Sequence, residues 1–438
     1  MRNYVINGGK SLKGEVTISG SKNVVLKALI AACLTDEEVT LINVPLIGDF
    51  YVMLDLFVEI GGKVTFDGHT VRLRLEKIKS TTIPLNIGAK IKTSSMFIAP
   101  LLARKGEATI PNPGGCRIGA RPIDRHIKGL EMMGAKISYY SKDGYFHSKT
   151  DGLSGVTYKF DKNTHTGTET LILAAVLAKG RTVLENAAEE AEIDELIKLL
   201  ISMGAKIKRS GRTIKVDGVN KLFGTTFSIV PDSNELVTCA ILSSLTGGQI
   251  VIKNADFSMV GEFLEKFKQA GGAWEKNDER VRFYFRNGIK SIDVTTKPYP
   301  GFKTDWQSPW AVLMTQADGD SEIHETVYEK RFSYVPELLK MGAHLEFFKP
   351  EVRNPKEFYN FNHEGKKNYN QGIKIHGPVK LHNAVLQISD LRAGATLIIA
   401  ALIADGESVI YGVDQVERGY EAFAERLKNL GAEIKVVD

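Results

Sequence analysis

Two kinds of helix alternate along this chain, separated by short strands. One kind is apolar nearly all round, as in residues 168–178 and 393–404. The other kind is amphipathic, as in residues 192–200, where charged positions interrupt Ile and Leu. A helix that is apolar on every side is buried, whereas an amphipathic helix covers a core and faces water on its other side. The pattern predicts a unit of strand, buried helix, strand, amphipathic helix and strand pair.

A short phrase marks the end of each amphipathic helix: an apolar helix end, then Gly-Gly or Gly-Ala, then an alternating strand. Its first glycine occurs at Gly61, Gly134, Gly204, Gly271, Gly342 and Gly431. Glycine fits a helix C-terminal cap, so each copy predicts a helix end followed two residues later by a strand. The first four spacings are 73, 70, 67 and 71 residues and the last is 89. We therefore predict six repeats, the last interval carrying an insertion at residues 347–371 that has the composition of a loop.

A buried helix in every repeat favours repeats gathered around shared centres over an extended solenoid. Three repeats per domain is the economical arrangement, with a division near residues 218–224, where the third copy ends. A strand expected at residues 14–18 precedes the first buried helix, so the N-terminal segment fits either domain. The fold class is α/β.

Composition places the chain among ordinary globular proteins, with 438 residues, 43% hydrophobic and 25% charged. A net charge of +5 suits anionic small molecules, and no basic tract or aromatic-basic pattern indicates nucleic acid. The N-terminus lacks an apolar signal stretch, and no run approaches the roughly 18 apolar residues of a membrane span. Three cysteines without disulfide or zinc spacing favour a reducing compartment. We expect a cytoplasmic protein without membrane insertion.

Polar residues open each predicted buried helix. They are Lys22-Asn23, Lys92, Lys162 with Thr164 and Thr166, Asp232, Asp305 and Arg392. Ordinary capping explains Thr166, Asp232 and Asp305. It does not explain the lysines or Arg392, because a cation opposes the helix dipole at that end unless an anion binds there. Two interpretations of these polar residues remain: they only cap their helices, or they form a set of anion-binding sites.

Cys116 lies in a loop of glycines and prolines, residues 111–122, beside Arg117 and Arg121. Neighbouring cations favour thiolate over thiol, which predicts a reactive cysteine; the alternative is a cysteine that happens to occupy a surface turn. Cys33 and Cys239 lie in apolar helical runs and read as core residues. Cations also precede the amphipathic helices of the last two repeats, at Arg331 and Arg418. If the domains face each other with these ends inward, the cleft suits a multiply anionic substrate.

At this point several motifs are recognisable together: Gly8-Gly9, Gly20-Ser-Lys-Asn23, residues 113–122, residues 298–305, Arg331-Phe332, Asp390-Leu-Arg392 and residues 418–421. In this order they resemble the enolpyruvyl transferases along the whole chain, apart from the late insertion. The resemblance implies an inside-out α/β barrel fold with two domains of three repeats each. One domain would be residues 22–230 and the other residues 1–21 with 231–438, joined by a double crossover near residues 20 and 230.

The cysteine loop is typical of the branch that transfers the enolpyruvyl group of phosphoenolpyruvate to the 3-hydroxyl of UDP-N-acetylglucosamine and releases phosphate. This is the first committed step of peptidoglycan synthesis. The implied reaction is an addition followed by an elimination, which requires an acid, a base and cationic clamps. The resemblance implies no metal and no organic cofactor, and the sequence carries no signal for an oligomeric state.

Roles follow from the same resemblance. Cys116 would be the general acid and could form a covalent phospholactoyl adduct, and Asp305 would be the base near the acceptor hydroxyl. The loop around Cys116 would close as a lid that excludes water. The implied catalytic set is Cys116, Asp305, Lys22, Arg392 and Arg418. The implied phosphoenolpyruvate contacts are Lys22, Asn23, Arg121 and Arg418, with Arg331 and Arg392 adding positive charge. The implied UDP-sugar contacts are Asn23, Lys92, Arg121, Pro122, Ile123, Asp124, Arg125, Lys162, Asn163, Thr164, His165, Asp305 and Val327.

Some positions depart from the usual pattern of the family, mostly on the acceptor side. Lys92 stands where arginine is customary, and residues 164–170 replace Ser-Val-Gly-Ala-Thr-Glu-Asn. Lys303 replaces a proline, Trp306 follows the aspartate, and Ser233-Asn234 replaces an Arg-Ile pair. A different nucleotide or phosphorylated acceptor therefore stays open, as does a non-catalytic nucleotide-sugar binder, although acid, base and clamps are all present. The aromatic insertion reads as a surface loop or a partner contact.

Overall fold

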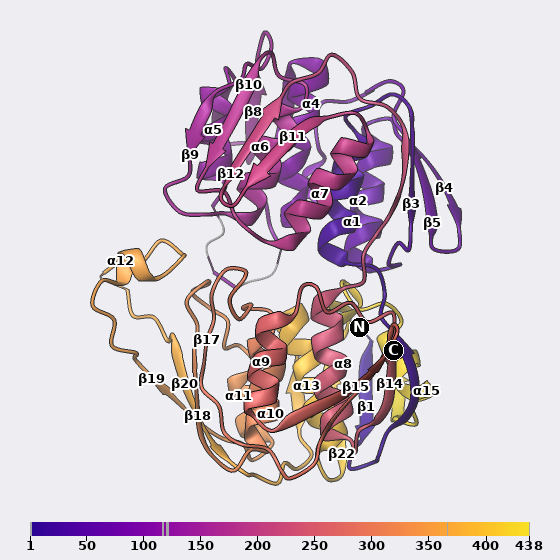
Figure 1. Ribbon diagram of the computed structural model, residues 1–438, viewed down its shortest axis with the longest axis vertical. Helices are drawn as coiled ribbons and strands as arrows, with labels where there is room; N and C mark the ends of the chain where they lie inside the picture. Colours follow the sequence, from indigo (N-terminus) through magenta and orange to yellow (C-terminus); the bar gives the residue numbers. More distant parts are fainter. Residues whose placement is uncertain (1, 116–117, 120–121, 366, 438) are drawn as a thin grey trace. The chain divides into compact units, whose positions relative to one another are not determined.

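The computed structural model describes residues 2–115, 118–119, 122–365 and 367–437, which form two compact units (Figure 1). One unit contains the described residues of 20–116 and 121–230, and the other those of 1–19, 117–120 and 231–438. The prediction had placed this division at 21/22 and 230/231. Cys116, Arg117 and Arg121 lie outside the described residues.

The unit of residues 20–230 carries three sheets, with strand orders β13-β3-β5-β4, β6-β8-β7 and β11-β12-β10-β9. Its strands are β3 (Glu38–Ile42), β4 (Lys63–Asp67), β5 (Thr70–Arg74), β6 (Glu107–Pro111), β7 (Lys136–Tyr140), β8 (Tyr145–Lys149), β9 (Thr157–Lys159), β10 (Arg181–Glu185), β11 (Lys206–Ser210), β12 (Thr213–Asp217) and β13 (Thr225–Ser228). Its helices are α1 (Lys22–Ala32), α2 (Gly48–Glu59), α3 (Leu85–Gly88), the 3₁₀ helix η1 (Lys92–Phe97), α4 (Ile98–Lys105), α5 (Asp124–Met132), α6 (His165–Ala175) and α7 (Ala191–Ser202).

The second unit also carries three sheets, with strand orders β15-β16-β14-β2, β17-β18-β20-β19 and β21-β22-β1-β23. Its strands are β1 (Asn3–Asn7), β2 (Lys13–Thr17), β14 (Gln249–Lys253), β15 (Gly272–Asn277), β16 (Arg280–Phe285), β17 (Val294–Thr295), β18 (Gly319–His324), β19 (His344–Phe348), β20 (Gly372–Gly377), β21 (Val385–Gln387), β22 (Glu407–Tyr411) and β23 (Glu433–Val437). Its helices are α8 (Ser233–Leu245), α9 (Gly261–Gln269), α10 (Gln307–Thr315), α11 (Val335–Lys340), α12 (Pro355–Phe358), α13 (Leu391–Ile403), α14 (Asp414–Glu417) and α15 (Phe423–Asn429).

The third repeat shows the predicted order without change: β9, α6, β10, α7 and the hairpin β11–β12. Strand β9 pairs parallel with β10 across the buried helix, with Thr157 opposite Val183, and β12 then pairs antiparallel with β10. A parallel pair needs a crossover connection, which the buried helix supplies. The other repeats vary this scheme, and the six predicted repeats and the α/β class are confirmed.

Strand exchange explains why the N-terminal segment fitted either domain. Strand β2 precedes α1 but pairs parallel with β14, whereas β13 precedes α8 but pairs parallel with β3. Strand β1 completes the sixth repeat by pairing with both β22 and β23. The chain passes between the units twice, and the two passages are hydrogen-bonded to each other within each unit. In one unit Ser21 N–H donates to Val230 O at 2.7 Å, and in the other Asp232 N–H donates to Ser19 O at 2.9 Å.

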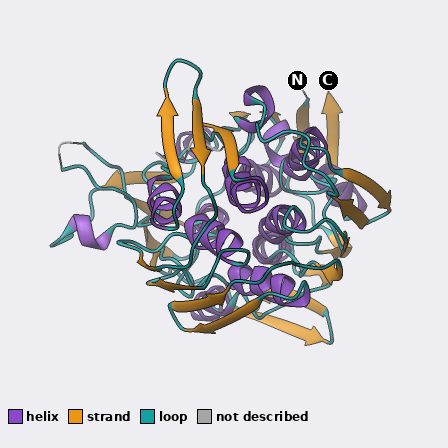
Figure 2. Ribbon diagram, turned by 90° about the horizontal axis from the view of Figure 1, so that it is seen from above, coloured by secondary structure: helices purple, strands orange, loops and turns teal. Residues whose placement is uncertain are grey.

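Most of the helices lie on the inner side of the sheets (Figure 2), whereas α12 lies outside them and has no buried residues. In the unit of residues 231–438, α8, α10 and α13 pack on one another, and nearly all of their residues are buried. The amphipathic α7 of the other unit instead leaves part of its surface to water. Among the described residues, no helix combines the length and the apolar character that crossing a bilayer requires.

The six repeat glycines all have left-handed backbone, with φ between +82° and +104°. Each follows the last turn of an amphipathic helix, where only glycine adopts this conformation without a steric cost from Cβ. The next strand begins two residues later in five repeats and one residue later in the fourth, where β15 begins at Gly272. The predicted caps are therefore confirmed.

The insertion at residues 347–371 is loop over most of its described length, as predicted, apart from its first two residues, which end β19, and the short helix α12. It contains stacked rings, in which Tyr359 and His363 lie 5.4 Å apart between centroids at an interplanar angle of 10°. Tyr359 is buried, and its hydroxyl lies 3.1 Å from His324 Nε2 at the end of β18. The sequence did not predict these ring contacts, because they leave no periodic pattern.

Gly8 approaches the end of α13 so closely that a Cβ there would overlap the backbone oxygens of Ala401 and Ala404. We expect Gly8→Ala to lower the free energy of unfolding by about 2 kcal/mol or more, because backbone atoms of a packed helix cannot move aside cheaply. Gly261→Ala is the control, since a Cβ there meets nothing within 4 Å. Urea unfolding of both variants tests this, and equal midpoints would contradict it.

Candidate functional site

Asp305 lies in the turn before α10 and is the centre of a cluster of charges in the unit of residues 231–438. Its Oδ1 accepts from Arg331 Nη2 at 2.5 Å and lies 3.5 Å from Arg392 Nε. Both arginine side chains are buried. The prediction that Asp305 caps the helix is wrong: α10 begins after Trp306 without a side-chain cap, because the carboxylate is engaged by the two guanidinium groups.

The charges set the protonation of Asp305. Burial by itself raises the pKa of this carboxyl, but Arg392, Arg331 and Lys303 lower it further than burial raises it, to well below its ordinary value. Asp305 is therefore ionised at neutral pH. An ionised carboxylate that is paired with cations can accept a proton once one of those cations binds another anion instead.

Arg392 lies in the first turn of α13, where a cation opposes the helix dipole. Asp390 caps this helix, since its Oδ1 accepts from the backbone N–H groups of Arg392 at 3.0 Å and Ala393 at 3.1 Å. Arg392 Nη1 donates to the Tyr420 hydroxyl at 3.1 Å, and the same hydroxyl lies 2.8 Å from Thr238 Oγ1. Tyr420 thus orients Arg392, although no role had been given to it within the motif of residues 418–421.

Arg418 lies between α14 and α15. Its Nη1 donates to Gln415 Oε1 at 3.0 Å, which holds it near the end of α14. Val327, expected at the acceptor sugar, follows β18 closely and donates its N–H to Glu325 Oε1 at 2.7 Å. Both residues belong to the unit that carries Asp305.

The unusual residues near Asp305 contact one another. Lys303 Nζ lies 3.3 Å from Ser233 Oγ, and Trp306 Nε1 donates to Asn234 Oδ1 at 3.0 Å. Lys303 is buried, with Nζ 5.4 Å from the Trp306 ring centre. Residues 233 and 234 therefore contact residues 303 and 306, and Lys303 places a buried positive charge beside Ser233.

Lys22 begins α1 in the other unit, beside Asn23. Ser21 caps the helix by accepting from Val24 N–H at 3.4 Å, and Lys22 Nζ lies 2.6 Å from Asp49 Oδ2 in the first turn of α2. Both charged side chains are buried. Asp49 thus offsets the cation that capping could not explain, and a buried ammonium group remains at the helix start.

The expected nucleotide-sugar segments gather around the start of α6. Thr164 caps this helix by accepting from Gly167 N–H at 3.4 Å, so the predicted capping by Thr166 is wrong. Thr166 Oγ1 instead lies 3.0 Å from His126 Nε2. Burial, followed by the charges of Lys92 and Arg125, lowers the pKa of His126 to about 3. This imidazole is therefore neutral between two cations.

Arg125 forms a two-pronged pair with Asp161, through Nε at 2.7 Å and Nη2 at 3.1 Å. This pair joins the first turn of α5 to the residue before Lys162 and Asn163. Burial and Arg125 lower the pKa of Lys162. Residues 122–124 precede or open α5, with Pro122 exposed and Ile123 buried. The structure therefore brings together Lys92, residues 122–125 and residues 162–165, while Arg121 lies outside the described residues.

Glu169 is buried between two cationic partners that sequence reasoning did not connect. His165 Nε2 lies 3.1 Å from Glu169 Oε1, and Lys27 Nζ lies 3.5 Å from Glu169 Oε2. Burial lowers the pKa of His165, but Glu169 raises it more, so the net shift is upward. The sequence carried one signal for these pairs: Lys27 and Glu169 are charged residues inside apolar helices. Charged residues are rarely buried without partners.

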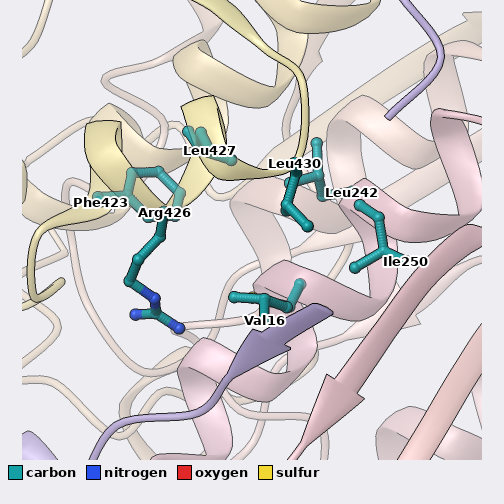
Figure 3. Close-up of a pocket in the computed structure, with 8 residues that line it drawn as sticks. Val16, Leu242, Ile250, Phe423, Arg426, Leu427 and Leu430 are labelled. Carbon is teal, nitrogen blue, oxygen red and sulfur yellow. The ribbon is translucent and has the colours of Figure 1, made fainter. Parts of the chain in front are cut away.

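The two described cysteines carry no reactive chemistry. Cys33 and Cys239 are buried, and burial raises the pKa of both thiols, that of Cys239 to about 12. Cys239 lines a small, largely apolar pocket with Val16, Leu242, Phe423 and Arg426 (Figure 3). Within the described ranges, no group of three His, Cys, Asp or Glu side chains could hold a metal ion. The reactive thiol of the prediction remains Cys116.

Known proteins similar to this chain form one consistent group. Residues 6–427 match the family described as EPSP synthase (3-phosphoshikimate 1-carboxyvinyltransferase). The UDP-N-acetylglucosamine 1-carboxyvinyltransferase of Solibacter usitatus is 42% identical over 100% of both chains, and that of Koribacter versatilis is 40% identical over 99% of this chain and 96% of its own.

Solved structures agree in fold. The enolpyruvyl transferase NikO from Streptomyces tendae has a TM-score of 0.86 at 22% identity, covering 100% of this chain and 99% of its own. EPSP synthase from Acinetobacter baumannii has a TM-score of 0.77 at 18% identity, covering 100% of both chains. The resemblance seen in the motifs is confirmed: the chain belongs to the EPSP synthase family of enolpyruvyl transferases.

Proposed function

We propose that this protein transfers the enolpyruvyl group of phosphoenolpyruvate to the 3-hydroxyl of UDP-N-acetylglucosamine and releases phosphate, the first committed step of peptidoglycan synthesis. The observation that carries the proposal is the Asp305 carboxylate held by Arg331 and Arg392. The names of relatives at about 40% identity over the full length support the acceptor. A cytoplasmic location belongs to the same proposal.

The chemistry needs an acid and a base at different carbons. Cys116 protonates the methylene carbon of phosphoenolpyruvate, while Asp305 removes the proton of the attacking hydroxyl. The tetrahedral ketal then expels phosphate while the Cys116 thiolate left by the first step takes a proton back from the methyl carbon, so that the carbon–carbon double bond of the enolpyruvyl group forms again. Arg392 and Arg331 offset the negative charge of the phosphate and carboxylate, as do Lys22, Arg121 and Arg418.

Substrate binding changes the base. In the free protein the arginines lower the pKa of Asp305, which makes it a weak base. An anionic substrate bound to the same arginines reduces their effect on Asp305, and the pKa of the carboxyl rises toward the range in which it accepts a proton efficiently. Phosphoenolpyruvate thereby helps to activate the base that acts on the second substrate.

The acceptor contacts are proposed at the start of α6 and at Val327. Lys92, Arg125 and Lys162 offer cations suited to a diphosphate, and the N-terminus of α6 adds the partial positive charge of its helix dipole. His165, kept basic by Glu169, stands where the family pattern has valine. The residues that depart from the family pattern on this side, such as Lys92 and His165, change which groups donate hydrogen bonds to an anionic acceptor, but donors remain.

Phosphate release from phosphoenolpyruvate with UDP-N-acetylglucosamine as acceptor tests the proposal. We expect release that requires both substrates and a product mass increased by one enolpyruvyl group. Reactions without acceptor, with 3-phosphoshikimate and with other UDP-sugars are the controls. Release with one of these acceptors and none with UDP-N-acetylglucosamine would contradict the proposal.

Cys116→Ser should abolish the covalent adduct of the enzyme. A serine hydroxyl has a pKa far above that of a thiol and does not add to phosphoenolpyruvate or open an epoxide at neutral pH. Intact-mass spectrometry after incubation with the epoxide phosphonate fosfomycin should show one added inhibitor in the wild type and none in the variant. Cys33 and Cys239 are buried, so modification of the variant would contradict the assignment.

A further inference from the structure

Glu325 is a fully buried carboxylate that the proposed reaction does not use. It follows β18 directly and is fixed through its backbone: its N–H donates to Gln371 O at 2.8 Å, and its carbonyl oxygen accepts from Gln371 Nε2 at 2.9 Å. Gln371 Nε2 also donates to Tyr328 O at 3.0 Å. Gln371 therefore holds the backbone of residues 325–328 at both of its ends, independently of any contact made by the Glu325 carboxylate.

The carboxylate of Glu325 joins two segments of the candidate site. Oε1 accepts from the backbone N–H groups of Val327 at 2.7 Å and Tyr328 at 3.0 Å. Oε2 accepts from the Thr304 hydroxyl at 2.8 Å. One side chain thus fixes the acceptor-side turn at Val327 and the residue before Asp305.

Hydrogen-bond direction extends this network to Arg331. Arg331 Nε can only donate, and it does so to Thr304 Oγ1 at 3.1 Å. The Thr304 hydroxyl has a single proton, which it directs to Glu325. Arg331 Nη2 then reaches Thr304 O at 3.2 Å and Asp305 Oδ1 at 2.5 Å. The two hydrogen bonds that lead from the Arg331 guanidinium to the Thr304 hydroxyl and from there to the Glu325 carboxylate can therefore run in one direction only.

We propose that Glu325 is a positioning residue for the transfer reaction: through Thr304 it fixes Arg331 against the base Asp305, and through the backbone of Val327 it fixes the acceptor-side turn. The inference rests on the proposed function, since Asp305 must be the base for its position to matter. Glu325 touches no reacting atom in this scheme. Its effect on the rate passes through the two groups that it holds.

Glu325→Gln tests the direction of the chain with almost no change in shape. The amide oxygen still accepts from Val327 and Tyr328, but the amide nitrogen then faces Thr304 and can only donate. Thr304 Oγ1 would meet two donors and its own proton would lose its acceptor, so Arg331 shifts from Asp305. We expect kcat to fall about 10- to 100-fold, while KM for UDP-N-acetylglucosamine stays within about twofold because the contacts to Val327 and Tyr328 on the acceptor side are kept.

Thr304→Val removes the link from the other end and should give a similar loss of kcat. The double variant should be no slower than the slower single one, because both changes break the same chain. Thr304→Ser restores the hydroxyl and should recover most of the loss seen with valine. This serine and valine pair decides the question even if Glu325→Gln folds poorly.

Glu235→Gln is the matched control, because Glu235 is also a buried carboxylate with an arginine partner, Arg426, and has no part in the proposed site. We expect its kcat to stay within about twofold of wild type. Wild-type kcat in Glu325→Gln, or additive losses in the double variant, would overturn the inference while wild-type activity still upholds the proposed function. A wild-type protein that releases no phosphate would overturn the proposed function, and this inference with it.

Discussion

Asp305→Asn should lower kcat by about a thousandfold and leave the binding of both substrates nearly unchanged. Asparagine has the same shape and keeps an oxygen toward Arg331 and Arg392, but it cannot take up the proton of the acceptor hydroxyl. The loss therefore falls on the chemical step. Single-turnover phosphate release and calorimetric titration with UDP-N-acetylglucosamine separate the chemical step from binding.

Asp217→Asn provides the control for this experiment. Asp217 also pairs with an arginine, Arg181, but both side chains are exposed, at the paired ends of strands β10 and β12. We expect full turnover there. A kcat above about a tenth of wild type in Asp305→Asn would show that another group accepts the proton.

The fold could be predicted from the sequence because each repeat carries its own local signals. Gly61 and the five equivalent glycines mark helix ends by a backbone requirement that no other residue meets cheaply. The buried and amphipathic helices differ in their periodicity. The exchange of β2 and β13 between sheets could not be predicted from pattern, because nothing in the sequence of either strand specifies the sheet that it joins, which only tertiary pairing decides.

The site could be predicted as a set of residues and not as a set of contacts. Asp305 and Arg392 were identified by motif, but the hydroxyl that orients Arg392 comes from Tyr420, 28 residues along the chain. Asp49 and Glu169 were missed for the same reason, since a buried partner is selected by the fold and leaves no spacing rule. Thr164 and Thr166 are both good capping residues, and the register of α6 decided between them.

The departures from the family pattern have a physical reading that sequence could not supply. Lys303 and Ser233 are 70 residues apart in the chain and in contact in the fold. Trp306 and Asn234 form a second contact beside them. These two contacts join four residues that depart from the family pattern, and they hold the Lys303 cation where it acts on Asp305. A cation kept beside the proposed base fits an enzyme better than a binder without catalytic activity.

Arg331→Met should lower the free energy of unfolding by about 3 kcal/mol or more. The Arg331 guanidinium is buried between two carboxylates, with Asp305 at 2.5 Å and Asp390 at 3.9 Å. Methionine fills similar space but leaves one buried carboxylate with a weaker set of partners, which costs more than the loss of the pair itself. Denaturant unfolding at neutral pH measures the difference.

Arg181→Met is the matched comparison, because the Arg181–Asp217 pair has similar geometry, with contacts of 2.6 Å and 3.1 Å, on exposed side chains. We expect a loss below about 1 kcal/mol there.

The pH dependence of the unfolding free energy gives a second check on Arg331→Met. A carboxyl whose pKa is lowered in the folded state contributes stability that is lost as the pH falls, and Arg331 is one cause of the lowered pKa of Asp305. The deficit of Arg331→Met should therefore narrow as the pH falls below the ordinary aspartate value of 3.8, and a deficit independent of pH would place its origin in packing instead of charge.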